Sequence, residues 1–264
     1  MSLRTVSATR YVTPLREGGS MPAVVEADDD GMYVLKFRGA GQGPRALVAE
    51  WIVGELARAP GFDVPEIVFV DLDPVLARTE GDPEIQSLIR ASGGLNRALD
   101  YLPGAANFDP LAWTPDPALA SRIVWFDALV GNVDRSARNT NLLVWHGKPW
   151  LIDHGATLTF HHGGQAPVAD AGKPFAAIAD HVLLPAASAL AQVDAELAAR
   201  LTPDVLQGVV DQVPESFLAL SAQDQPGGSA LATAAAQRQA YLDYFTARVA
   251  DRARWLEGAE RARA

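Results

Sequence analysis

Residues 132–156, NVDRSARNTNLLVWHGKPWLIDHGA, contain two strongly β-prone runs on either side of the turn-forming sequence HGKP at 146–149. Asp134 and Asn139 stand in the loop that leads into the first run, and Asp153 follows the second. The pattern predicts a tight β-hairpin with two acids and an amide at its open end.

The register of this hairpin should place Asp153 opposite Asn141 or Leu142, close to Asp134 and Asn139. Bare carboxylates repel one another, whereas Mg²⁺ accepts one or two protein oxygens and completes its shell with phosphates and water. The spacing Asp-x-x-x-x-Asn, followed by a strand pair and a second Asp, is typical of phosphoryl transfer. Each residue alone would be interpreted as a turn former or a cap, but the ordered set indicates a site.

The composition restricts the class of protein. The chain has 264 residues, enough for one large domain or two lobes that share a core, and its 48% hydrophobic and 20% charged residues are ordinary for a globular protein. A net charge of −10 argues against general nucleic-acid binding, and the lack of cysteine excludes disulfides and thiolate metal sites. No run approaches the ~20 apolar residues of a membrane span, and the start has no signal core, so we expect a cytoplasmic protein.

Strand-like runs come first along the chain and helical patterns come second. The strand-like runs are at 5–14, 23–26, 32–37, 67–72 and 96–102, with helices at 45–59 and 83–90. Beyond Pro103-Gly104 the helical patterns are at 118–130, 175–184, 186–201, 205–213 and 229–257. This order predicts an α+β fold with two lobes, a small β-rich lobe at 1–104 and a larger, mostly helical lobe at 105–264.

Lys36 lies inside a β-prone run, YVLKF. An edge lysine that discourages aggregation is one interpretation. The other is an inward lysine, which needs an anionic partner. The helix at 45–59 offers Glu50 and Glu55, and the sequence does not choose between them.

A glycine-containing turn, EGGS at 17–20, precedes this strand. The backbone N–H groups of Gly18, Gly19 and Ser20 could approach a phosphate there. Ordinary hairpins use the same residues, so the turn indicates phosphate binding only weakly.

Four motifs together resemble the HipA-like kinases, a branch of the protein-kinase-like superfamily near the phosphoinositide lipid kinases. They are YVLKF at 33–37, AEWIVGELARAPGFDVPEI at 49–67, NVDRSARNTNLLVW at 132–145 and WLIDHGA at 150–156. The resemblance covers residues 12–160 and implies the two-lobed protein-kinase-like fold and an enzyme that depends on ATP and Mg²⁺.

The resemblance also implies roles for individual residues. These are Lys36 as the phosphate-binding lysine, Glu50 as its ion-pair partner, Asp134 as the catalytic aspartate that takes the proton of the acceptor hydroxyl, and Asn139 and Asp153 as metal ligands. Asp100, Tyr101 and Leu102 would form the hinge between the lobes, whose backbone meets adenine.

Two positions depart from the usual pattern of these relatives. Ser136 stands where they usually carry a histidine two residues after the catalytic Asp, and the triplet Asp153-His154-Gly155 has no Phe in the middle. The aminoglycoside and choline kinase-like enzymes usually carry a histidine two residues before the catalytic Asp, where this chain has Asn132. That difference favours the HipA-like branch.

The acceptor hydroxyl stays open at this point: Ser or Thr of a protein, a small molecule, or a lipid. A nucleotide-binding pseudokinase with a regulatory or scaffold role is the alternative that Ser136 supports. An unrelated metal-dependent hydrolase is disfavoured by the order lysine, acid, hinge, Asp/Asn and Asp along the chain.

Several other polar and aromatic residues have more than one interpretation. Arg135 and Arg138 are either solvated loop arginines or ligands for an acidic substrate. We expect His161 in a polar loop, His181 on a helix surface or in packing, and Trp51 in packing between the lobes.

Overall fold

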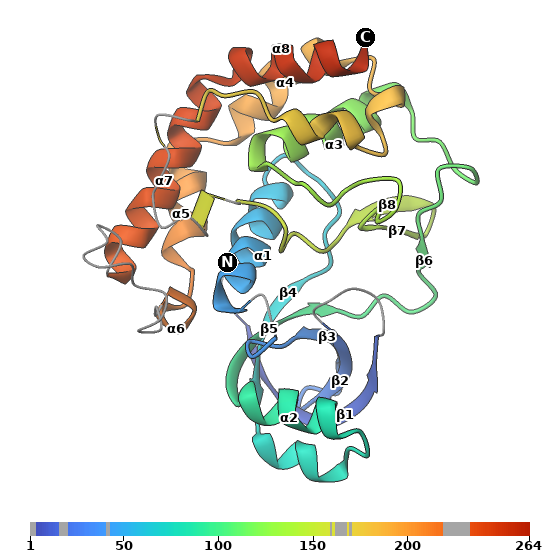
Figure 1. Cartoon of the computed structure of the whole chain (residues 1–264), viewed down its shortest axis with the longest axis vertical. Helices are drawn as coiled ribbons and strands as arrows, with labels where there is room; N and C mark the ends of the chain where they lie inside the picture. Colours follow the sequence, from blue (N-terminus) through green and yellow to red (C-terminus); the bar gives the residue numbers. More distant parts are fainter. Residues whose placement is uncertain are drawn as a thin grey trace.

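The structure is a computed structural model that describes residues 4–15, 21–40, 43–158, 160–161, 168, 171–218 and 233–264. A small β-barrel occupies one end of the molecule and a larger group of helices the other (Figure 1). The predicted α+β, two-lobed architecture is therefore confirmed. No helix within the described ranges is long and apolar enough to cross a membrane.

Five strands close into a barrel in the order β1-β2-β3-β5-β4. Their bounds are β1 Thr5–Pro14, β2 Ala23–Ala27, β3 Met32–Lys36, β4 Ile67–Leu72 and β5 Gly94–Asp100. The β1–β4 pair is parallel and the other pairs are antiparallel. Alternate side chains such as Val25, Leu35 and Val68 fill the interior. Helix α2 (Pro83–Ala91) and the 3₁₀ helix η1 (Pro74–Thr79) pack against this interior and close the far end (Figure 1).

Helix α1 (Gly43–Arg58) connects the barrel to the helical lobe. Trp51 stacks on Phe69 of β4 with ring centroids 5.0 Å apart, and its Nε1 donates to the carbonyl of Val209 at 3.2 Å. Val209 belongs to α5 (Pro203–Asp211), and Phe217 of α6 (Glu215–Leu218) also packs on Phe69. The predicted packing of Trp51 between the lobes is confirmed, and one apolar core extends across both lobes.

The predicted hairpin is present as β7 (Leu142–Trp145) and β8 (Lys148–Leu151), with β6 (Ala106–Asn107) as a third strand beside β7. Its turn consists of only His146 and Gly147, both with positive φ (49° and 74°), as in the tight turns that suit strand twist.

This short turn changes the register from the predicted one. Leu142 pairs with Leu151, and the N–H of Ile152 donates to the carbonyl of Asn141 at 3.2 Å. The expectation that Asp153 lies opposite Asn141 or Leu142 was therefore wrong, because it assumed a four-residue turn. Asp153 lies just beyond the paired residues, and it has a positive φ of 53°.

Helix α3 (Pro117–Val130) runs through the centre of the helical lobe and is buried along most of its length. Asp116 caps its start by accepting N–H groups, which typically contributes about 1 kcal/mol, and Gly131 ends it in the left-handed conformation. Around it lie η4 (Ala176–Asp180), η5 (Leu184–Ala186), α4 (Leu190–Arg200), α7 (Ala234–Ala250) and α8 (Arg252–Arg263).

Two predicted helices differ from the structure. The pattern at 175–184 is a short 3₁₀ helix that ends before His181, because the backbone of His181 forms a β-bridge with Ser136. The pattern at 229–257 is divided at Asp251 between α7 and α8, and its first residues lie outside the described part of the chain.

Candidate active site

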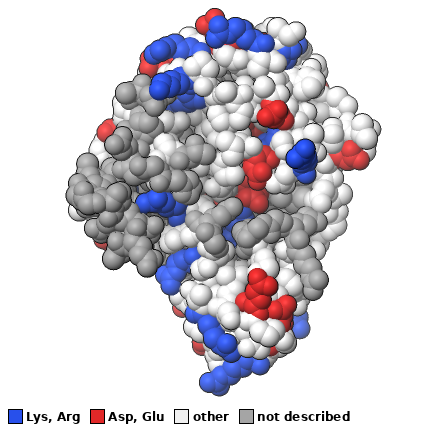
Figure 2. All heavy atoms as spheres, viewed as in Figure 1, with Lys and Arg blue, Asp and Glu red and all other residues white. Residues whose placement is uncertain are grey.

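A cavity of about 650 Å³ lies between the barrel and the hairpin β7–β8, a size suited to a small-molecule ligand. Val34 and Leu99 of the barrel and Leu142 and Ile152 of the hairpin form apolar walls. Polar side chains meet them at one end, among them Lys36, Asn139 and Asp153. Figure 2 shows acidic side chains gathered in the middle of the visible face, above the barrel, with basic atoms beside them.

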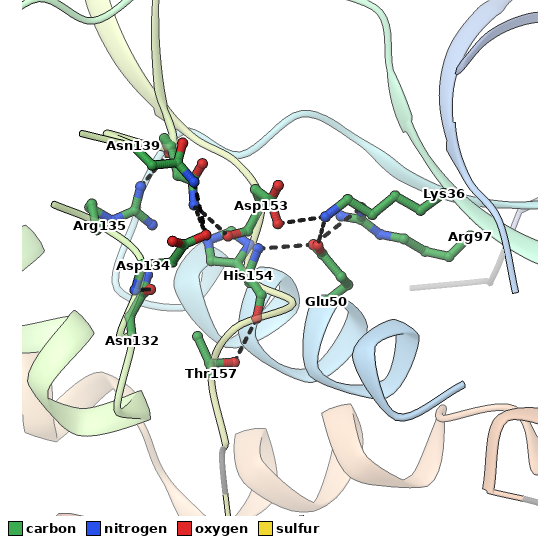
Figure 3. A network of polar contacts seen from close by, with 11 residues as sticks. Lys36, Glu50, Arg97, Asn132, Asp134, Arg135, Asn139, Asp153, His154 and Thr157 are labelled. Atoms are coloured by element: carbon green, nitrogen blue, oxygen red, sulfur yellow. Dashed lines mark hydrogen bonds and ion pairs between the residues drawn. The ribbon is translucent and has the colours of Figure 1, made fainter. Parts of the chain in front are cut away.

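Lys36 lies at the cavity wall between two carboxylates (Figure 3). Its Nζ contacts the carboxylate of Glu50 and lies 2.5 Å from Oδ1 of Asp153. Glu55 instead pairs with Arg58, with Oε1 and Nε 3.1 Å apart. The structure thus gives Lys36 an inward position and selects Glu50 as its partner.

Arg97 is a second cation beside Glu50, and sequence analysis missed it. The register of β3 and β5 pairs Lys36 with Arg97, so both side chains leave the barrel on the face that α1 covers. Nη1 of Arg97 lies 3.2 Å from Oε2 of Glu50, which also accepts the backbone N–H of His154 at 3.0 Å. Arg97 is fully buried. Within the described residues its guanidinium has no hydrogen bond, and Glu50 is the only carboxylate within 4 Å of it.

The pKa values of this cluster follow from burial and from neighbouring charge. Burial would raise the pKa of the Glu50 carboxyl, but Lys36 and Arg97 outweigh it and hold the pKa well below its usual range. Burial would lower the pKa of the Lys36 ammonium, but Glu50 and Asp153 keep it raised. Burial and the charge of Glu50 raise the pKa of Asp153 in spite of Lys36. Asp153 is thus the carboxylate whose negative charge is least compensated, and a further cation there would be favourable.

Asp134, the predicted catalytic residue, lies in the loop between α3 and β7, together with Asn139, one of the two predicted metal ligands. Its Oδ2 accepts from Nδ2 of Asn139 at 2.9 Å and from Nδ2 of Asn141 at 3.3 Å. Asn141, which has a positive φ of 46°, also donates to the carbonyl of Asp153 at 3.4 Å. The structure therefore brings Asp134, Asn139 and Asp153 to one end of the hairpin (Figure 3). Asn141 connects Asp134 to Asp153.

A second buried acid, Asp127, contacts side chains of this loop, and sequence analysis also missed it. Asp127 accepts from Asn132, Arg135 and His181, and all four side chains are buried. Burial would raise the pKa of Asp127, but Arg135 outweighs it and holds the pKa well below its usual range. The available signal was an acid within the otherwise apolar helix sequence IVWFDALV.

These contacts change the interpretation of three residues. Arg135 is neither solvated nor free to bind a substrate, because it is buried in an ion pair with Asp127. His181 is a packed residue that contacts Asp127, one of its two expected settings. His161 is buried rather than part of a polar loop, and its Nδ1 lies 2.8 Å from the hydroxyl of Tyr241.

The predicted hinge residues Asp100 and Tyr101 use their backbone N–H groups within the protein. The N–H of Asp100 donates to the carbonyl of Glu66 at 2.8 Å, and that of Tyr101 to the carbonyl of Met32 at 3.0 Å. These two donors are already used within the barrel, and Leu99 and residues 107–110 line the cavity, so a contact of residues 100–102 with adenine stays a prediction. Gly18, Gly19 and Ser20 lie outside the described residues.

The family follows from comparison with known proteins. A family model described as HipA-like kinase matches residues 9–225, most of the chain and all of the site above. The chain belongs to the HipA-like kinase family. This HipA-like kinase is accordingly a phosphotransferase, as the motifs predicted. None of the curated proteins matches it.

Three solved structures resemble this HipA-like kinase distantly. A Helicobacter pylori proinflammatory kinase, CtkA, has 10% identity and a TM-score of 0.49, over 99% of this chain and 98% of that one. The Golgi casein kinase has 11% identity and a TM-score of 0.46, over 95% and 73%. Its structure with Mn and ADP bound has 12% identity and a TM-score of 0.46, over 94% and 74%. At these values the family assignment rests on the sequence match.

Proposed function

We propose that this HipA-like kinase binds ATP with Mg²⁺ in the cavity between the lobes and transfers the γ-phosphate to a hydroxyl acceptor. The observation that supports this most is the position of Lys36, held between Glu50 and Asp153 at the cavity wall. A lysine paired with a helix acid, next to a metal-binding acid, is the arrangement that kinases use to hold nucleotide phosphates.

Asn139 and Asp153 are the residues we assign to the metal. Both line the cavity, and the side chain of Asp153 is 36% exposed. Two oxygen ligands of this kind suit Mg²⁺, which takes its remaining ligands from phosphate and water. When bound, the ion neutralises charge on the transferred phosphoryl group. Its charge would also compensate the carboxylate of Asp153, which is poorly compensated because Lys36 is shared with Glu50.

Asp134 is the residue we assign to the acceptor. Its Oδ2 is occupied by the amides of Asn139 and Asn141, which fixes the carboxylate plane. We assign the other oxygen, Oδ1, to the acceptor hydroxyl, which Asp134 would orient and deprotonate.

We place the boundary between the nucleotide-binding lobe, 1–104, and the second lobe, 105–264, at the turn formed by Pro103 and Gly104. The second lobe contains the loop between α3 and β7, residues 131–141, which we call the catalytic loop. Gly104 has a φ of 77°, which suits a sharp change of direction. Helix α1 belongs to the first lobe by sequence but packs on α5 and α6, so the two lobes share one core.

Thermal melting with and without ATP and MgCl₂ tests nucleotide binding. A ligand at ~100 times its dissociation constant adds about 2.7 kcal/mol of stability, and the gain should require the metal. Lys36→Ala should remove the gain in a protein that still folds. A folded wild-type protein whose melting point does not respond to ATP and metal would refute the proposed function.

Radiolabelled ATP and a cell extract test the transfer itself. Label on protein, lipid or a small molecule would identify the class of acceptor, and Asp134→Asn provides the matched blank. Metal-dependent binding of ATP without any transfer or hydrolysis would favour the pseudokinase alternative.

A further inference from the structure

The Asp127 carboxylate is fully buried, and its two oxygens are occupied entirely by side chains that belong to or touch the catalytic loop. Oδ1 accepts from Nδ2 of Asn132 at 2.9 Å. Oδ2 accepts from Nε of Arg135 at 2.5 Å and lies 2.8 Å from Nε2 of His181. The N–H of Leu183 donates to Nδ1 of His181 at 3.0 Å, so Nε2 carries the proton and donates to Asp127.

Two of these partners, Asn132 and Arg135, each make a further hydrogen bond toward the site. Oδ1 of Asn132 accepts the backbone N–H of Asp134 at 3.0 Å (Figure 3). Nη1 of Arg135 donates to the carbonyl of Asn141, whose side chain in turn donates to Asp134. Asp127 is therefore connected to Asp134 by two chains of hydrogen bonds. One ends at the backbone N–H of Asp134 and the other at the carboxylate of Asp134.

We propose that Asp127 is a positioning residue for phosphoryl transfer, and that the relay from Asp127 through Asn132 to the N–H of Asp134 sets the orientation of the catalytic carboxylate. The inference rests on the role of Asp134 in the proposed function. A buried ion pair contributes little net stability compared with apolar residues of the same volume. Placement of Asp134 is what the Asp127 cluster adds, since a shift of ~1 Å at a reacting group costs about 10²-fold in rate.

The relay has a direction that a substitution can reverse. Asp127 only accepts, so Asn132 must turn its amide nitrogen to Asp127 and its oxygen to Asp134. In Asp127→Asn the new amide can donate to Asn132, which then turns its oxygen away and presents its nitrogen to the N–H of Asp134. The double variant Asp127→Asn with Asn132→Asp restores an acceptor next to that N–H.

Turnover and nucleotide binding of four variants test the relay. Asn132→Ala and Asp127→Asn should each lower kcat by about 10–100-fold, with the affinity for ATP·Mg within about two-fold of wild type. The double variant should recover about ten-fold in kcat over Asp127→Asn, because the pair is coupled. Asp194→Asn is the matched control and should keep kcat: Asp194 accepts from Trp125 of the same helix and from Arg252, away from the loop.

Amide hydrogen exchange at Asp134 separates failure of the relay from failure of the proposed function. In Asn132→Ala the Asp134 amide should exchange at least ten-fold faster, whether or not the protein transfers phosphate, and in Asp194→Asn it should not. If the wild type is active and Asn132→Ala keeps its kcat, the relay is refuted. It is also refuted if the Asp134 amide exchanges at an unchanged rate in Asn132→Ala. If the wild type transfers no phosphate but the Asp134 amide exchanges faster in Asn132→Ala, only the proposed function of Asp134 is refuted. If the losses of kcat in the double variant are additive, Asp127 acts only as structural support.

Discussion

Glu50 and Asp127 are both fully buried acids with lowered pKa values, yet their surroundings differ. Glu50 shares Lys36 with Asp153, which opens onto the cavity, and its other cation, Arg97, has no hydrogen bond within the described residues. Asp127 has three side-chain partners, and each of them is bonded onward to the backbone of the loop or of residues 181–183.

The difference indicates which cluster can change partners. Two cations and two carboxylates balance in the cluster of Lys36, Glu50, Arg97 and Asp153, so a cation at Asp153 would free Lys36 for an anion in the cavity. The Asp127 cluster has no such opening, because its carboxylate is fully buried and both oxygens already accept from donors within the protein. We infer that the first cluster can respond to a ligand and that the second holds the site in place.

The largest effects should come from Asp134 and Asp153. Asp134→Asn should lower turnover by about 10²–10⁴-fold and leave nucleotide affinity near that of wild type. Asp153→Asn should reduce turnover at least as much and also weaken Mg²⁺-dependent nucleotide binding, because it removes the negative charge of a proposed metal ligand. Isothermal titration beside a turnover assay measures both. If the two variants show the opposite pattern, their roles are exchanged; if binding and turnover do not separate, both are turn-forming residues.

A smaller effect is expected on stability at Glu50. Glu50→Gln leaves Arg97 fully buried without an anion, and removal of one partner of a buried pair costs about 3–5 kcal/mol. Glu55→Gln is the matched control on the same helix and should cost less than about 1 kcal/mol, since its pair with Arg58 is partly exposed. Denaturant unfolding measures both free energies. If Glu50→Gln and Glu55→Gln lose the same free energy of unfolding, the burial of Arg97 without an anion carries no extra cost.

Acid should weaken the second cluster. The folded pKa of Asp127 lies below its value in the unfolded chain, about 3.9, so its contribution is complete above that pH. It is lost as the pH falls through the folded pKa, with a slope of up to about 1.4 kcal/mol per pH unit. Asp127→Asn should lack this slope, and Asp194→Asn should retain it. Urea unfolding between pH 5 and 2.5 measures it, and parallel curves for wild type and Asp127→Asn would contradict the charge assignment.

The smallest effect is expected at His154, between the two clusters. Its ring is fully buried, and neither nitrogen has a hydrogen-bond partner among the described residues, while its backbone N–H donates to Glu50. His154→Phe keeps the backbone contact and should change stability by less than about 1.5 kcal/mol, with turnover retained. A loss above ~3 kcal/mol in thermal or urea unfolding would reveal a polar role for the ring.

The catalytic loop could be predicted from the sequence because its information is local. Asp134, Asn139 and Asp153 are joined by a hairpin whose strands and turn are short, and β3 places Lys36 by simple alternation. Even there the register was wrong, because the sequence HGKP does not reveal whether the turn has two residues or four.

Other parts of the site could not be predicted because they depend on which faces pack together. Glu50 and Glu55 are both acids of one helix, and only the packing of α1 on both lobes buries the first. The N–H groups of Asp100 and Tyr101, the predicted hinge residues, donate to the carbonyls of Glu66 and Met32, and these partners could not be read from the sequence.

The order of motifs along the chain was sufficient to determine the family, the two lobes and the loop that carries Asp134. The charge balance was decided by tertiary structure alone. Lys36 meets Asp153 across 117 residues, and Asp127 meets His181 across 54. A buried charge is tolerated only beside its counter-charge. Which distant side chain supplies that counter-charge depends on how the barrel, α1 and α3 pack, and no local pattern contains that geometry.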